Sequence, residues 1–308
     1  MTWCWTRWIY YGVGYCWSCR VDLLRNHRFN GSTPQLADVL SVTSGKGGVG
    51  KTSISVNLAL LFQQLRKRVL LIDADIHLGN VDLVLGLRPR KTLADVLLGE
   101  AEMESILIPG PGGIDILPAS SGVAELLDCE SQIIRRLNRE FQTLQSRYHL
   151  ILLDTGAGLS KVVLSFIRSS VKTVLVVTPD PASIADAYGM MKVISRHIPR
   201  HPILILANMV STYDEGTSIF QKLNLMASRF LNQSLEYAGS IPRSADWAQA
   251  VLKQTPLLLQ QEHSMAARAL KMVGRNVLRS PGNPDDRLRG FFDGFLEKNL
   301  LSEEMIGD

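Results

Sequence analysis

The residues best suited to chemistry lie in one glycine-rich stretch, residues 44–53, which reads SGKGGVGKTS. The stretch fills the G-x-x-x-x-G-K-[ST] pattern, in which glycines let successive backbone N–H groups point at phosphate oxygens. We expect the Lys51 ammonium to reach the β- and γ-phosphates and the Thr52 hydroxyl to ligate Mg²⁺. The residues predicted to bind nucleotide here are Gly45, Lys46, Gly47, Gly48, Val49, Gly50, Lys51, Thr52 and Ser53.

The neighbours of this stretch fit a strand, a loop and a helix in that order. Residues 38–44 form a short β-branched run that is typical of a buried strand. After the loop, apolar residues recur at helical spacing, at Ile54, Leu58, Leu61 and Leu65. A helix that begins here would direct its N-terminus at an anion, which favours nucleotide binding over a plain glycine-rich turn.

Asp154 is the predicted outer-shell ligand of Mg²⁺. It follows four apolar residues, 150–153, and precedes the sequence TGAG at 155–158. A carboxylate at a strand end beside a phosphate loop suits this role. The glycines after it would let backbone N–H groups approach a γ-phosphate and rearrange when it leaves. The alternative is an aspartate that caps an ordinary turn.

Asp73 and Asp75 form a second acidic pair at a strand end. Two carboxylates beside a triphosphate would repel it unless a metal or lysine compensates, so we expect them near the metal and the attacking water. Asp75 is the candidate for orienting that water, and Asp73 for a second-shell place at the metal. A helix N-cap is the alternative for Asp75. His77 is expected to lie in solvent or in a switch loop.

The sequence favours adenine as the base. A GTPase would carry N-K-x-D after a late strand, whereas here the corresponding strand ends in Asn-Met-Val-Ser at 208–211. The aspartate needed for guanine is missing, so ATP is the expected nucleotide. Asn208 is predicted to face the base edge, with a strand-end cap as the alternative.

Apolar strands alternating with amphipathic helices predict an α/β fold. Helical stretches are expected at 131–147 and 182–198, besides the one after the phosphate loop. Continuous apolar strands indicate a mostly parallel, doubly wound sheet flanked by helices, with ligands at the carboxyl ends of its strands. The further strands are expected at 68–74, 113–119, 149–155, 172–179, 202–209 and 237–242.

Composition places the chain among globular proteins. Its 308 residues are 46% hydrophobic and 20% charged, with a formal net charge of +4. That charge is too small to indicate nucleic-acid binding by itself, and no apolar run approaches the ~20 residues of a spanning helix. Residues 1–36 differ from the rest in holding four tryptophans and three cysteines. Their one C-x-x-C pair supplies only half of the ligands of a zinc site, so we expect an irregular extension or a misassigned start codon. The rest of the sequence shows no disulfide framework, so we expect a reducing compartment.

The end of the chain is predicted to form a hinge and an amphipathic helix, at residues 281–308, after an ATPase domain at 37–280. Breaker residues at 280–286 precede five apolar side chains that would share one helix face. Such a face suits a membrane surface, although the polar side is of mixed charge and two glycines weaken the helix. Packing of the tail onto its own domain is the alternative. The five predicted membrane-binding residues are Leu288, Phe291, Phe292, Phe295 and Leu296.

Three motifs together resemble the MinD/ParA branch of P-loop ATPases, a SIMIBI-type fold. They are KGGVGKT at 46–52, DAD followed by NVD within 73–82, and DTGAG at 154–158. Within this branch the chain looks most similar to the flagellar-number regulators, the FlhG/FleN group. The likeness covers roughly residues 38–260, and its longer stretches lie at 56–60, 81–97, 178–192 and 205–210.

The resemblance implies an ATPase switch with Mg²⁺ and ATP as cofactors. In this branch the early lysine, here Lys46, reaches across a dimer interface to the partner's phosphates, so the implied catalytic residues are Lys46, Lys51 and Asp75. It also implies an ATP-bound homodimer in the cytoplasm that associates reversibly with the inner membrane. The implied partners are an FlhF-like GTPase, flagellar C-ring proteins or a flagellar transcription activator.

Two departures from the family pattern qualify these implications. His77 stands where the family usually has glycine, and the D-Q-rich segment that activates FlhF is missing from residues 1–37. The alternatives are a cell-division MinD, which shares the motifs, a ParA-type DNA partition ATPase, and an iron–sulfur carrier. A partition ATPase would call for a basic patch and no amphipathic tail. An iron–sulfur carrier needs paired cysteines, whereas Cys129 stands alone after the N-terminal stretch.

Overall fold

The computed structural model describes residues 36–75, 81–118, 131–283 and 291–295. Residues 1–35 form a unit of their own and lie outside the described residues, and a second unit begins at Leu36. The predicted extension at 1–36, except for Leu36, and His77 thus lie outside the described residues. Among the described helices, none is long and apolar enough to cross a membrane.

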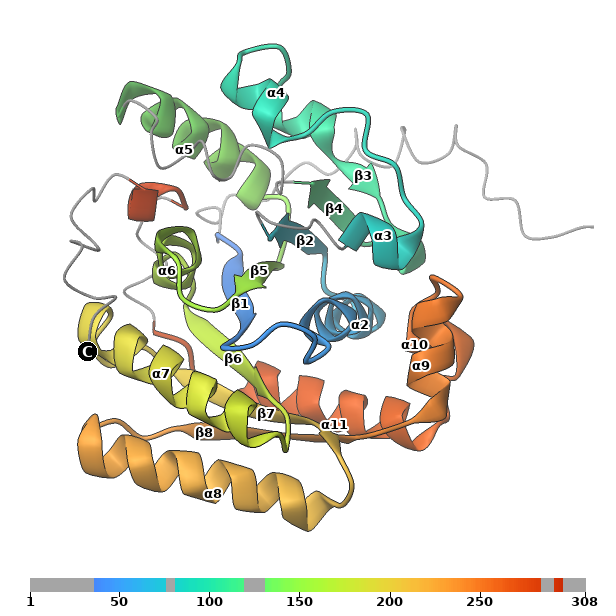
Figure 1. The fold of residues 1–308 in the computed structure, drawn as a ribbon. Helices are drawn as coiled ribbons and strands as arrows, with labels where there is room; N and C mark the ends of the chain where they lie inside the picture. Colours follow the sequence, from blue (N-terminus) through green and yellow to red (C-terminus); the bar gives the residue numbers. More distant parts are fainter. Residues whose placement is uncertain (1–35, 76–80, 119–130, 284–290, 296–308) are drawn as a thin grey trace, which may run out of the picture. The chain divides into compact units, whose positions relative to one another are not determined.

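An eight-stranded sheet in the order β3-β4-β2-β5-β1-β6-β7-β8 forms the centre of this unit (Figure 1). All neighbouring strands are parallel except β3, a two-residue edge strand that pairs antiparallel with β4. The predicted mostly parallel α/β fold is thus confirmed, and the antiparallel edge was not anticipated. The strands are β1 Asp38–Ser44, β2 Val69–Ala74, β3 Ile108–Pro109, β4 Asp115–Pro118, β5 Leu150–Ala157, β6 Lys172–Val177, β7 Ile203–Val210 and β8 Glu236–Pro242.

Helices cover both faces of the sheet (Figure 1). Helices α2 and α11 pack on one face in one apolar cluster, whereas α5, α6, α7 and α8 belong to clusters on the other face. The helices are α2 Lys51–Gln64, α3 Val81–Leu85, α4 Leu93–Leu97, α5 Ser131–Gln145, α6 Lys161–Arg168, α7 Pro181–His197, α8 Tyr213–Phe230, α9 Ala245–Leu252, α10 Leu257–Gln260 and α11 Met265–Arg279. Short 3₁₀ helices span Met103–Ile106, Pro111–Gly113 and Asp293–Phe295.

The strand sequences explain this arrangement. Leu150 and Leu152 of β5 join the cluster under α2 and α11, whereas Ile151 and Leu153 join the opposite cluster. Because successive side chains of a strand point to opposite faces, an unbroken apolar run can only be satisfied by a sheet that is covered on both sides. The carboxyl ends of the parallel strands are left free to build a site.

Helix α11 is fixed closely to the domain at its middle and at its end. At Gly274 an added Cβ would come within 2.3 Å of Leu61 on α2, so the two helices can approach this closely only with glycine there. The Lys172 ammonium at the start of β6 donates to the carbonyl oxygens of Val277 and Ser280, at 2.6 and 2.5 Å. The end of α11 is therefore held at the amino-terminal edge of the sheet.

The C-terminal tail differs from its predicted form. Phe291, Phe292 and Phe295 are buried, and residues 293–295 form a 3₁₀ turn instead of an exposed α-helix. The Phe291 ring stacks on Phe141 of α5 at a centroid distance of 4.1 Å. In this state the three phenylalanines cannot contact a membrane, because their apolar faces are satisfied by α5 and α6. Leu288 and Leu296 lie outside the described residues.

Polar groups fix the position of the tail. The Asn138 side chain on α5 donates to an Asp293 carboxylate oxygen and accepts from the Phe292 backbone N–H, both at 2.7 Å. The Ser169 hydroxyl donates to the Phe291 carbonyl oxygen. These hydrogen bonds fix the tail in one position on α5 and α6.

Candidate functional site

The glycine-rich stretch lies between β1 and α2, as its sequence predicts. Gly48 and Gly50 have φ values of +76° and +87°, in the left-handed region that favours glycine. At Gly50 an added Cβ would also come within 2.7 Å of the Asn208 side-chain nitrogen. Glycine at this position is therefore needed for both the backbone turn and the contact with β7.

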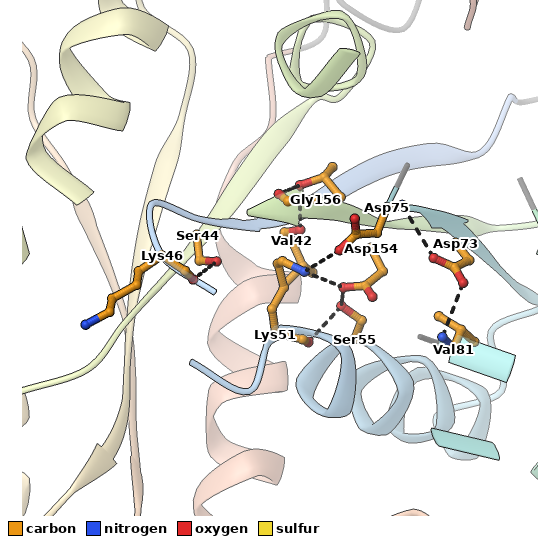
Figure 2. A network of polar contacts seen from close by, with 11 residues as sticks. Val42, Ser44, Lys46, Lys51, Ser55, Asp73, Asp75, Val81, Asp154 and Gly156 are labelled. Carbon is orange, nitrogen blue, oxygen red and sulfur yellow. Dashed lines mark hydrogen bonds and ion pairs between the residues drawn. The ribbon is translucent and has the colours of Figure 1, made fainter. Parts of the chain in front are cut away.

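Lys51 lies at the centre of a buried polar cluster (Figure 2). Its side chain is 8% exposed, and its Nζ lies 3.7 Å from Asp154 Oδ1 and 4.0 Å from Asp75 Oδ2. The first residue of α2, the residue after β2 and the middle of β5 thus meet at one point. A lysine held between two carboxylates at the start of a helix is placed to receive a phosphate that would share its charge.

Asp154 fits the predicted place near Mg²⁺. It is fully buried, and its Oδ1 accepts from the Ser55 hydroxyl at 2.9 Å. Burial raises the pKa of Asp154, and this effect is opposed by Lys51 and by hydrogen bonds from Thr52 and Ser55. Its Oδ2 has no hydrogen-bond partner among the described residues. A buried carboxylate oxygen left without a donor, beside the Thr52 hydroxyl, fits a hydrated Mg²⁺, whose water molecules would donate to it.

No cluster of three or more histidine, cysteine, aspartate or glutamate side chains that could hold a metal occurs in the described part of the chain. This finding is compatible with Mg²⁺, which proteins usually bind through one or two groups together with substrate phosphates and water. Thr52 and Asp154 are the residues that would hold it here.

Asp75 and Asp73 lie at the end of β2 and face different surroundings. Asp75 is buried, lines the cleft beside Lys51, and would be 3.4 Å from an added Cβ at Gly156. It therefore lies next to the glycine-containing segment predicted to approach the γ-phosphate. Asp73 accepts at Oδ1 from the Asp75 N–H and at Oδ2 from the Val81 N–H, at 3.4 and 3.2 Å.

These contacts give Asp73 a task that its sequence context did not reveal. Asp73 pairs in register with Asp154 on the neighbouring strand, and it binds the backbone on both sides of residues 76–80. Its predicted second-shell role at the metal stays a prediction. The carboxylate already has a structural function in holding Asp75 and the start of α3.

Lys46 points away from Lys51 and the cluster around it (Figure 2). Its side chain is 44% exposed and forms an ion pair with Asp180, the N-cap of α7. Asp180 raises the pKa of Lys46, and Lys46 in turn lowers the pKa of Asp180. Within one subunit, this lysine is therefore directed outward, away from the place where its own phosphates would lie.

Asn208 connects β7 to the phosphate loop. Its side chain is buried, and its Nδ2 donates to the Val49 carbonyl oxygen at 2.7 Å. Because this carbonyl can only accept, the amide orientation is fixed by its partner. Asn208 thus supports the loop directly and also lines the cleft; its predicted contact with the base edge stays a prediction.

A cleft of about 840 Å³ extends from the phosphate loop to α9, a volume that suits a nucleotide. It is lined by the phosphate loop, Asp75, Ala157, Asn208, Pro242 and residues of α9. Sequence reasoning missed Arg243 and Trp247 in this lining, and also Asp180 and Ser55. The place of Asp180 just after the β6 run could have indicated a residue at the same sheet edge.

Comparison with known proteins places this site in a family. A family model described as "ParA: NUBPL iron-transfer P-loop NTPase" matches residues 35–278. The antiactivator FleN of Pseudomonas aeruginosa is 40% identical over 262 residues, covering 84% of this chain and 92% of FleN. The flagellum site-determining protein YlxH of Helicobacter pylori is 36% identical over 216 residues, covering 67% of this chain and 70% of YlxH.

Solved structures agree with the sequence comparisons. MinD in the MinC:MinD cell division complex of Aquifex aeolicus has a TM-score of 0.64 at 27% identity, covering 79% of this chain and 96% of that one. MinD of Pyrococcus horikoshii, solved in complex with Mg-ADP, has a TM-score of 0.63 at 23% identity, covering 79% and 97%. The family model over residues 35–278 and the 40% identity to FleN show that the chain belongs to the MinD/ParA family of P-loop ATPases.

Proposed function

We propose that this protein is an ATP-dependent, dimerising switch that hydrolyses ATP with Mg²⁺ and regulates flagellar number or placement. The observation that carries the proposal is the 40% identity to FleN over 84% of the chain. The similarity to YlxH, a flagellum site-determining protein by name, supports the same assignment. A cell-division MinD is the second candidate, because a septum site-determining MinD of Emiliania huxleyi is 36% identical over 79% of this chain, below FleN in both measures.

The sequence supports ATP as the nucleotide, because the aspartate of the guanine-binding N-K-x-D pattern is missing after Asn208. One N–H of the Asn208 amide donates to the Val49 carbonyl, which leaves its second N–H and its Oδ1 for other partners. Asn208 is proposed to contact the edge of the base with these remaining groups.

In hydrolysis, each residue of the cluster would have a separate role. Lys51 binds the β- and γ-phosphates, Thr52 and Asp154 hold Mg²⁺, and Asp75 orients the attacking water. When bound, Mg²⁺ neutralises charge on the phosphates. Transition-state charge on the γ-phosphoryl group would then be stabilised by an additional cation.

Lys46 is the residue proposed to supply that cation to a second subunit. Its side chain pairs with Asp180 and points away from Lys51, the lysine proposed to bind its own phosphates. A partner subunit that faces the cleft would accept this lysine in exchange for Asp180. Hydrolysis would then require the dimer, and ATP binding would assemble it.

Membrane association is proposed to involve the tail after release from α5 and α6. Moving the three phenylalanines from α5 and α6 into water would cost roughly 5–9 kcal/mol of free energy, at about 1.5–3 kcal/mol each. Their insertion into a bilayer would be favourable by a similar free energy. One tail therefore gains little by exchanging its own domain for lipid. Two tails on an ATP-bound dimer gain avidity, so dimerisation would shift the balance towards the inner membrane.

The proposed partners follow from the flagellar assignment. They are an FlhF-like GTPase, flagellar C-ring proteins or a flagellar transcription activator, the last suggested by the antiactivator name of FleN. Iron transfer is disfavoured, because Cys129 is the one cysteine in the sequence after residue 35 and an iron–sulfur carrier needs paired cysteines.

Dimerisation is tested by light scattering after size-exclusion chromatography, with ATP or ADP. Wild-type protein is expected to dimerise with ATP and Mg²⁺ and to stay monomeric with ADP. Lys46→Ala should remain monomeric with ATP while still binding nucleotide, because it removes the cross-subunit charge and leaves Lys51 in place. The control is Lys192→Ala, an exposed lysine on α7. Normal ATP-dependent dimers of Lys46→Ala would exclude the cross-subunit role.

The flagellar role is tested in the native bacterium by counting flagella per cell. A chromosomal Lys51→Ala allele should alter flagellar number or position, and the Lys192→Ala allele should not. Unchanged flagella together with misplaced division septa would assign the chain to cell division instead.

A further inference from the structure

The solvent face of α11 carries an unusual set of side chains. At about 100° per residue, five side chains fall within about 80° of arc around the helix. The two methionines among them are 66% and 62% exposed, and the three arginines are exposed as well. We call this surface the Met/Arg stripe; it consists of Met265, Arg268, Met272, Arg275 and Arg279.

The stripe has a strong positive charge without compensation on its own helix. No aspartate or glutamate occurs in α11, and the adjacent Glu262 is paired with Lys271 at 2.7 Å. The Arg268 Nε donates to the His263 carbonyl oxygen, which leaves the terminal nitrogens of its guanidinium available. Stabilisation of the helix dipole explains only Arg279, because Arg268 and Arg275 lie before the last turn.

Charge distribution along the chain indicates what the stripe contacts. Residues 281–308 contain seven acidic and three basic side chains, so their formal charge is −4. The whole chain has a formal charge of +4, so residues 1–280 carry +8. The tail is therefore repelled by an anionic lipid surface, however apolar its phenylalanines are. If the protein cycles on a membrane, the electrostatic attraction must come from another element.

The position of α11 makes it that element. Lys172 fixes the end of α11 at the amino-terminal edge of the sheet, and the tail begins there. A tail released from α5 and α6 would therefore reach a membrane surface next to the stripe. The stripe is convex and about 21 Å long, because Met265 and Arg279 are 14 positions apart and each position adds about 1.5 Å along the helix. A convex helix face suits a plane of headgroups better than a helical peptide, which needs a groove.

We propose that the Met/Arg stripe of α11 docks on a bilayer rich in anionic lipid headgroups, an inference that rests on the proposed membrane cycle. The guanidinium groups bind lipid phosphates, as their planar donor forks favour. The two thioethers enter the boundary between headgroups and acyl chains, while the arginine stems extend back to the phosphates. The stripe supplies the charge that the tail lacks.

The test is co-sedimentation of the full chain with vesicles of phosphatidylcholine alone or mixed equally with phosphatidylglycerol, in the presence of ATP and Mg²⁺. The test variant is Arg268→Gln/Arg275→Gln/Arg279→Gln. The control is Lys192→Gln/Arg196→Gln/Lys222→Gln, which removes three exposed charges from α7 and α8 on the other face of the sheet. Light scattering monitors ATP-dependent dimerisation of each protein.

The expected result is that wild type and control bind the anionic vesicles and that the stripe variant binds them about 100-fold more weakly, since each arginine near the surface contributes about fivefold. Wild-type binding should fall with added salt. Met272→Gln should weaken binding without changing its salt dependence.

Equal binding by the stripe variant and the control would overturn the proposal. So would loss of retention on duplex DNA by the stripe variant with unchanged vesicle binding, because the stripe would then serve nucleic acid. Failure of the ATPase switch is recognised separately, since wild-type protein would then not dimerise with ATP whatever its lipid binding.

Discussion

The two lysines of the phosphate-loop sequence point in different directions. Lys51 is buried between Asp75 and Asp154, whereas Lys46 is exposed and pairs with Asp180. The Lys51 charge therefore lies inside the site and the Lys46 charge outside it. In the proposed dimer, Lys46 would supply its charge to the site of the second subunit.

Asp75→Asn tests the water-positioning role. The change keeps the shape of the side chain and removes the charge that would orient and polarise the water, so kcat for ATP hydrolysis should fall by about 10²–10³-fold. Dimers formed with ATP should persist longer, since hydrolysis releases them. Phosphate release and dimer lifetime are the measurements.

The control for this prediction is Asp214→Asn, an exposed carboxylate in the first turn of α8. It should leave both quantities unchanged. Turnover by Asp75→Asn at the wild-type rate would assign another residue to the attacking water.

At the scale of elements, a few specific contacts hold the tail against α5 and α6. Asn138 makes two hydrogen bonds to the tail with one amide, and Phe141 supplies the ring on which Phe291 stacks. Removing a buried hydrogen-bond partner typically costs about 1–3 kcal/mol, which is enough to shift a docking equilibrium without unfolding the domain.

Asn138→Ala is therefore expected to raise the undocked population of the tail by about tenfold or more. Limited proteolysis with mass spectrometry should detect faster cleavage within residues 284–308. Thr143→Ala on the exposed side of the same helix is the matched control and should leave the cleavage rate unchanged. Equal rates for the two variants would mean that Asn138 does not hold the tail.

The elements also show how far sequence reasoning extends. Strands of continuous apolar residues, such as 150–153, could be predicted because burial on both faces leaves a direct pattern in the sequence. The tail could not be assigned, because an apolar face looks the same whether it meets lipid or α5. The edge strand β3 has two residues, too few to form a pattern, and the Lys46–Asp180 pair depends on residues 134 positions apart that meet only in the folded chain.

At the scale of the whole molecule, a buried chain of polar side chains joins β1, β6 and the segment that precedes β7. The Thr173 hydroxyl contacts the Ser41 hydroxyl and the His201 Nε2, both at 2.7 Å. Burial lowers the pKa of His201 to about 4. The folded protein therefore keeps this imidazole neutral in a pH range where the unfolded chain protonates it.

Global stability should follow from that difference. Between pH 6.5 and 4 the unfolded chain binds a proton that the folded chain does not, so the free energy of unfolding falls as the pH falls. The His201 contribution to this loss is about 2 kcal/mol at pH 5 relative to neutral pH. Urea unfolding at pH 7.5 and 5.0 measures it.

His201→Gln should lower stability at pH 7.5 and flatten the dependence on pH. The exposed His263→Gln is the control and should keep the wild-type dependence. If both variants lose stability equally on acidification, other groups are responsible.

The hydrogen bond from Asn208 to Val49 links two properties that enzymologists usually measure apart. In its proposed role at the base edge, the same amide would also hold the phosphate-loop backbone through Val49. Selectivity among nucleotides and affinity for the triphosphate would then depend on each other. A substitution at position 208 would loosen both together, and a nucleotide with a mismatched base would be held less firmly at its phosphates as well.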